Sequence, residues 1–139
     1  MIHVEISNRQ QALPVDRRLL RRAVRAVLTG EGIADAEVSL AIVDDPTIRD
    51  LHRRYLGLDD PTDVLSFVLE RTETWLEGEV IVSADTARTA APRYGCSPAE
   101  ELLRYVIHGT LHLAGYRDDT PRERATMRAG ERRYLAAMR

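Results

Sequence analysis

Four stretches of the chain alternate apolar and polar residues or run apolar throughout, which is the pattern of half-buried or buried β-strands. They cover residues 2–7, 37–43, 64–69 and 78–83. Because only a hairpin-length connection at 71–77 separates the last two stretches, we predict that these two strands pair antiparallel.

Five further stretches repeat their apolar residues at helical spacing and begin at residues that favour helix N-termini. Two of them open with a capping-box sequence, at Ser97 and at Thr120. The expected helices run from Asp16 to about Thr29, from Asp45 to Tyr55, over residues 84–94, from Ser97 to Gly115 and from Thr120 to about Met138.

This order of elements predicts a single α+β domain over residues 1–139, with a small mixed four-stranded sheet packed against about five helices. The stretch 102–113 consists mostly of apolar residues and good helix formers. A helix that is apolar nearly all round is buried, so we expect this helix to be the central one.

The composition is typical of a globular protein outside the membrane. Hydrophobic residues make up 44% of the chain, but no apolar run is long enough for a transmembrane helix. The N-terminal residues 1–6 resemble a strand rather than a signal peptide. Cys96 is the only cysteine, which excludes an internal disulfide framework and indicates a reducing cytoplasm.

The charge pattern is unusual in its basic residues. The net charge of −2 does not indicate a nucleic-acid binder, yet all 20 basic residues are arginine. Genome base composition is the simplest cause. The first predicted helix carries an arginine face, which is either a solvated surface or a patch that contacts RNA phosphates. Its members are Arg17, Arg18, Arg21, Arg22 and Arg25.

The predicted central helix carries a candidate metal site. His108 and His112 are four residues apart, which places both imidazoles on one face of a helix. After Gly115 the chain can fold back, so that Asp118 or Asp119 comes within reach. Two imidazoles and one carboxylate leave a position for water, as catalytic metal sites do.

Three segments carry a resemblance to a known family. They are Gly57-x-Asp59-x-Pro61-Thr62-Asp63-Val64-Leu65-Ser66-Phe67, Gly78-Glu79-Val80-Ile81-Val82-Ser83 and His108-Gly109-x-Leu111-His112-Leu113-x-Gly115-Tyr116. In this order and spacing they resemble the bacterial YbeY proteins, which are metal-dependent endoribonucleases. The resemblance extends over nearly the whole chain.

The resemblance implies a hydrolase of single-stranded RNA that acts in 3′-end maturation of 16S ribosomal RNA and in ribosome quality control. It implies zinc as the metal, held by three residues of which the first two fall on His108 and His112. The implied partners are ribosomal RNA or the small ribosomal subunit, with a ribosomal protein or an assembly GTPase in addition.

The chain departs from the family pattern at two positions. The third ligand, usually a histidine, falls on Asp118, and a carboxylate there also suits Fe(II), Mn(II) or Ni(II). Leu56 stands where members of the family often carry an arginine that has been taken as functional. Arg53 and Arg54 lie close enough in sequence to substitute for it.

Three residues are candidates for catalysis beyond the metal. Arg54 and Arg104 can hold phosphates and stabilise developing charge, although Arg104 is equally explained as an ion-pairing or surface residue. Asp63 precedes a strand and can approach the site as a base, but capping or turn formation explains it equally well.

Two alternatives to the nuclease remain open. One is a non-catalytic ribosome-assembly factor, in which a metal only stabilises the fold and arginine faces bind RNA. The other is a different metal hydrolase, such as a peptidase. Position 109, where HExxH metallopeptidases carry their catalytic glutamate, is glycine, which weakens the peptidase interpretation.

Overall fold

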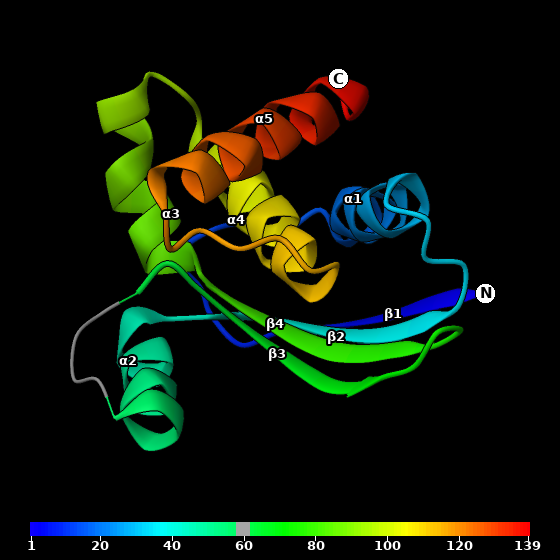
Figure 1. Ribbon diagram of the computed structural model, residues 1–139. Coiled ribbons are helices and arrows are strands. Elements are labelled where there is room, and N and C mark those ends of the chain that lie inside the picture. The colour runs from blue at the N-terminus through cyan, green and yellow to red at the C-terminus, as the bar shows by residue number, and fades with distance from the viewer. Residues whose placement is uncertain (58–61) are drawn as a thin grey trace.

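Four strands form one mixed sheet (Figure 1). The order across the sheet is β1-β2-β4-β3, and β1, β2 and β4 run parallel while β3 is antiparallel to β4. The strands are β1 (Ile2–Asn8), β2 (Ala36–Val43), β3 (Val64–Arg71) and β4 (Leu76–Ser83). The predicted hairpin is confirmed. Its turn covers only residues 72–75, so β3 continues past residue 69 and β4 begins before residue 78.

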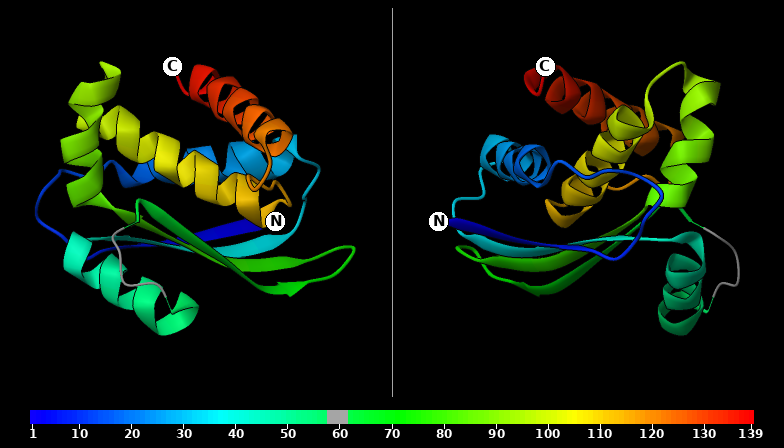
Figure 2. Two further views of the ribbon diagram at one scale, coloured as in Figure 1. Left: turned by 60° about the vertical axis from the view of Figure 1, so that its left-hand side comes forward. Right: turned by 180° about the vertical axis from the view of Figure 1, so that it is seen from behind.

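The helices flank the sheet unequally. α2 lies on one face, and α1, α4 and α5 lie on the other (Figures 1 and 2). The computed structural model describes residues 1–57 and 62–139, and no helix in these ranges is long and apolar enough to cross a membrane. The helices are α1 (Arg17–Gly30), α2 (Asp45–Leu56), α3 (Ala84–Ala90), α4 (Pro98–Leu113) and α5 (Pro121–Ala137), with a 3₁₀ turn η1 (Ala91–Tyr94) after α3.

The helix starts follow the predicted capping residues, with one correction. Thr120 and Glu123 form the reciprocal capping box at α5. At α4 the Ser97 side chain accepts from the Glu100 backbone N–H at 3.1 Å, but the Glu100 carboxylate lies 3.6 Å from Arg139 Nη2. The Ser97 box is therefore confirmed only as a serine cap.

The helix predicted over residues 84–94 changes character before its end. Its second part is the 3₁₀ turn η1, which contains Pro92. Proline has no backbone N–H and its ring collides with the preceding helical turn, so an α-helix cannot continue through it unchanged.

α4 is the central helix, as its apolar sequence predicts. Ten of its 16 residues are buried, and it packs between the sheet, α1, α3 and α5. One cluster of buried side chains joins α1 and α4 to the sheet, and a smaller one joins α2 to the opposite face. The fold-class prediction is thus confirmed.

α4 approaches the sheet so closely that position 109 has no room for a side chain. A Cβ on Gly109 would lie 2.6 Å from Val80 Cγ1 and 3.0 Å from Val64 Cγ2. Ser66 Oγ also donates a hydrogen bond of 3.0 Å to the Gly109 carbonyl. Position 109 therefore faces the sheet.

We predict that Gly109→Ala destabilises the protein by about 1–3 kcal/mol through overpacking, although alanine is favoured over glycine in a helix by about 1 kcal/mol. Urea denaturation measures the free energy of unfolding. Gly130→Ala on α5 is the matched control. Its Cβ would meet side-chain atoms of Leu111 and Tyr116 no closer than 3.1 Å, so its loss of stability should be smaller. A Gly109→Ala protein as stable as the wild type, or more stable, would contradict the close approach of α4 to the sheet.

Candidate metal centre

The three side chains named from the family motif meet at one point. His108 and His112 lie one turn apart on α4, and Asp118 reaches them from the following loop. The two Nε2 atoms are 3.1 Å apart, and Asp118 Oδ2 lies 3.5 Å from His108 Nε2 and 3.3 Å from His112 Nε2. Ligands placed tetrahedrally at about 2.1 Å from one zinc ion lie about 3.4 Å apart, so these separations suit a single ion.

The loop after α4 brings Asp118, and not Asp119, to the histidines. Gly115 turns the chain at a φ of 112°, which favours glycine. Arg124 Nη1 then donates to the carbonyls of Asp118 and Asp119 at 3.4 and 3.1 Å. The Asp119 side chain is 71% exposed and pairs with Arg117 at 3.4 Å. Of the two aspartates that the sequence offers, Asp118 is the one in the cluster.

A backbone carbonyl holds His112 in one tautomer. Its Nδ1 lies 2.9 Å from the carbonyl oxygen of Tyr116. Because a carbonyl oxygen can only accept, Nδ1 carries the hydrogen, and Nε2 of the neutral imidazole is left with a free lone pair. That lone pair faces His108 and Asp118.

A buried carboxylate holds His108 in the same tautomer. Its Nδ1 lies 2.7 Å from Oε2 of Glu131 on α5, whose side chain is only 7% exposed. Burial raises the pKa of Glu131, but the hydrogen bonds from His108 and Arg104 and the positive charge of Arg104 outweigh it, so the pKa lies below its usual value. The ionised carboxylate accepts from Nδ1–H and leaves the second Nε2 lone pair free.

With both imidazoles neutral, these contacts leave three electron-rich atoms facing one another with no hydrogen between them. Such an arrangement is electrostatically unfavourable unless a cation occupies its centre. Carboxylate and carbonyl partners of this kind orient histidine ligands in metal sites. The donor set of two imidazoles and one carboxylate therefore fits a divalent metal ion, and the cluster could hold one.

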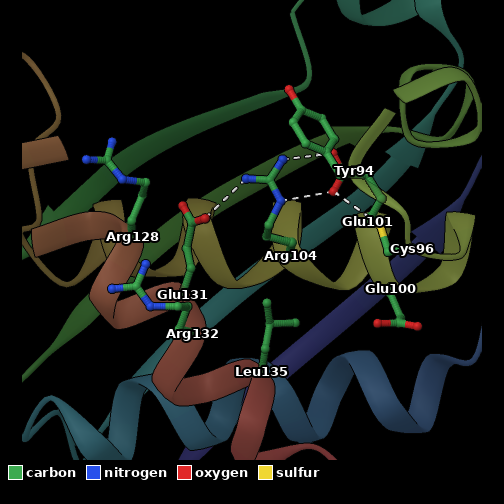
Figure 3. Close-up of a pocket in the computed structure, with 9 residues that line it drawn as sticks. All are labelled: Tyr94, Cys96, Glu100, Glu101, Arg104, Arg128, Glu131, Arg132 and Leu135. Carbon is green, nitrogen blue, oxygen red and sulfur yellow. Dashed lines mark hydrogen bonds and ion pairs between the residues drawn. The ribbon is translucent and has the colours of Figure 1, made fainter. Parts of the chain in front are cut away.

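Arg104 connects Glu131 to a second buried carboxylate (Figure 3). Its Nε and Nη2 donate to the two oxygens of Glu101 at 3.0 and 2.8 Å, and its Nη1 donates to Glu131 at 3.1 Å. The hydrogen bonds to Glu101 raise the pKa of Arg104, so the guanidinium stays charged. Arg104 thus lies behind Glu131, where it positions a partner of His108, and its predicted contact with substrate stays a prediction.

Glu131 and the Tyr116 carbonyl are site groups that the sequence does not predict. Glu131 shares the buried face of α5 with Met127 and Tyr134. A carboxylate at a core position needs a partner. The position of Glu131 on the apolar face of its helix is therefore the feature of the sequence that could have indicated a role for it. A backbone carbonyl has no sequence signal of its own.

A cavity of about 500 Å³ opens beside the cluster at the β3 edge of the sheet. Asp63 lines it together with the three clustered residues, so the structure brings this predicted residue to the site. Leu56, at the position where the family often has arginine, also lines the cavity.

The two arginines considered as substitutes at position 56 lie on the surface of α2. Arg53 pairs with Asp50 at 2.7 Å and Arg54 pairs with the same carboxylate at 3.4 Å. Arg54 lines a different hollow, which involves β1, β2 and β4. The structure therefore does not bring Arg54 into the cavity beside the histidines.

Three of the five α1 arginines contact backbone atoms of β1. Arg17, Arg21 and Arg25 each donate to a β1 carbonyl oxygen, at 2.9, 3.3 and 3.3 Å. Four helical residues advance about 6 Å and two strand residues about 6.6 Å, so the two rows match. Arg22 donates to a carbonyl near the C-terminus. RNA binding by this face, Arg18 included, stays a prediction.

Known proteins are similar to this one over nearly its whole length. A family model described as "Endoribonuclease YbeY" matches residues 5–139. This chain belongs to the YbeY family. The family predicted from the three sequence segments is therefore confirmed; residues 58–61 of the first segment lie outside the described residues.

Named members of the YbeY family align with nearly all of this chain. The Endoribonuclease YbeY of Moorella thermoacetica is 42% identical, over 96% of this chain and 95% of the relative. That of Rhodopirellula baltica is also 42% identical, over 91% of this chain and 65% of the relative. The solution structure of a Thermotoga maritima protein superposes with a TM-score of 0.67 at 27% identity, covering 99% of this chain and 89% of that one.

We predict that in metal-free protein, at a pH where the imidazoles are neutral, His108 and His112 both carry their hydrogen on Nδ1. Long-range ¹⁵N–¹H NMR correlations of the imidazole rings measure this directly. His3, which is exposed and has no partner among the described residues, is the internal reference. A hydrogen on Nε2 of either clustered histidine would contradict the assigned partners.

Proposed function

We propose that this chain is a metal-dependent endoribonuclease that hydrolyses phosphodiesters of single-stranded RNA. The observation that carries the proposal is the convergence of His108, His112 and Asp118 on one point, in a chain whose relatives are named endoribonucleases. Its proposed substrate is the 3′ region of 16S ribosomal RNA in the cytoplasm, on the small ribosomal subunit. A ribosomal protein or an assembly GTPase is the proposed protein partner.

Zinc is the proposed ion, at about one per chain. Bound there, it would act as a Lewis acid that lowers the pKa of a water molecule and polarises a phosphoryl oxygen. The carboxylate of Asp118 is harder than a third imidazole and lowers the positive charge of the centre, so Mn(II), Fe(II) and Ni(II) are also accommodated.

The protein's own groups keep the ligands ready. Glu131 and the Tyr116 carbonyl hold the two imidazoles in the tautomer that leaves Nε2 free. Arg104 in turn holds Glu131, because its guanidinium bridges Glu131 and the buried Glu101. The ligand set thus needs little rearrangement to act, and such preorganisation is a main source of catalytic power.

The remaining predicted residues have separate roles in this proposal. Asp63 lines the cavity and accepts a proton from the attacking water. Arg54 and the α1 arginines, which lie outside the cavity, contact phosphates of the RNA at a distance from the cut.

A peptidase is disfavoured by the packing of α4. The glutamate that HExxH enzymes use as a base would have to stand at position 109. There the helix faces Val80 at a distance that leaves no room even for a Cβ. An assembly factor without catalysis uses the same fold, and the following experiment distinguishes it.

We predict that His112→Ala and Asp118→Ala lose both bound metal and cleavage of a single-stranded 16S 3′ fragment, because each removes one of three ligands. Metal content by mass spectrometry and cleavage by gel electrophoresis, on the same preparations, measure the two losses. Circular dichroism checks that the variants remain folded.

Asp119→Ala is the matched control, since the Asp119 side chain is exposed and pairs with Arg117 outside the cluster. It should keep both metal and activity. Wild-type protein that binds metal and RNA without cutting would replace the nuclease with the assembly factor.

We also predict that Asp118→His shifts metal preference toward zinc relative to Mn(II), because imidazole is a softer ligand than carboxylate. Dialysis against equal concentrations of both ions, followed by elemental analysis, measures the ratio. Asp119→His controls for the added histidine. An unchanged ratio would mean that Asp118 does not coordinate the ion.

A further inference from the structure

Exposed apolar side chains are concentrated where α2 ends and along β3. Tyr55, Leu56, Val68 and Leu69 are exposed to 63%, 52%, 48% and 57%. In residues 1–57 and 62–139, the other large apolar side chains with such exposure are Met1 and Tyr94. Exposed apolar surface of this kind is typical of regions that contact another molecule.

This cluster borders the candidate metal centre. Leu56, Phe67 and Val68 line the same cavity as His108, His112 and Asp118. The Tyr55 ring stands against the Phe67 ring, with centroids 5.7 Å apart and planes inclined by 58°. We call Tyr55, Leu56, Phe67 and Val68 the apolar rim. Three of these four residues line the cavity of the candidate ligands, and Tyr55 adjoins it through Phe67.

We propose that the apolar rim binds an unpaired base of the RNA, with the rings of Tyr55 and Phe67 as the stacking surface. This inference rests on the proposed nuclease function. Aromatic side chains bind single strands because every base has a π-face. Tyr55 contacts Phe67, and Phe67 lines the cavity that contains the candidate ligands, so a base stacked on these rings belongs to a nucleotide near the phosphate being cut.

The proposal also gives single-strand preference a physical origin. A base within a duplex is covered by its neighbours on both faces, so it cannot lie on a protein ring. Thr62, Asp63 and Ser66 line the same cavity and supply polar groups beside the apolar ones. Leu56 contributes exposed apolar surface to this rim.

The test uses metal-loaded full-length protein and a short single-stranded RNA that carries 2-aminopurine at successive positions. Stopped-flow fluorescence reports stacking before cleavage, and cleavage rates give kcat and KM. For Tyr55→Ala we expect about tenfold higher KM, nearly unchanged kcat, and loss of the quenching at one or two positions. Tyr55→Phe should restore the wild-type behaviour, because the ring is retained.

Trp75→Ala is the matched control, since Trp75 is a partly exposed aromatic residue in the turn between β3 and β4 and lines a different hollow. It should leave KM and quenching unchanged, and all variants should keep their metal. An unchanged KM and unchanged quenching in Tyr55→Ala would overturn the stacking site, leaving the nuclease intact. Position-specific quenching that depends on Tyr55, with no cleavage by any preparation, would support the stacking site and overturn the nuclease.

Discussion

The burial of α4 on almost every side is the constraint on which the site depends. A buried helix can carry polar side chains only if each finds a partner. Arg104 donates hydrogen bonds to both Glu101 and Glu131, and Glu131 also accepts from Nδ1 of His108. The two Nε2 atoms are left facing each other and the cavity, so the packing of a central helix creates the chemical character of the site.

The same packing restricts the chemistry. Gly109 and Gly78 allow α4 to approach the sheet, because a side chain on either would meet atoms of the other layer. The helix therefore presents its reactive groups on one side and none toward the strands. Any further catalytic group has to come from a neighbouring element. Asp63 is a candidate, because it lines the cavity beside His108, His112 and Asp118.

Local features of the sequence predict most of the fold, and non-local contacts account for what it misses. Capping residues, glycines and apolar period locate α4, α5 and the hairpin because these signals act within a few residues. The spacing of His108 and His112 is such a local signal. The choice of Asp118 over Asp119 depends on how Gly115 and Arg124 shape a loop, which no spacing rule supplies. The contact between Glu131 and His108 joins two helices, so neither residue alone predicts it.

The arginines of α1 have a consequence for how this sheet can meet other molecules. β1 is an edge strand, and an unprotected edge invites a strand from another chain to add to it. Here guanidinium groups already occupy three carbonyls of that edge. An incoming strand would have to displace all three before it could pair. The sheet is thereby protected against β-type aggregation on this side, and its accessible border is β3, beside the cavity.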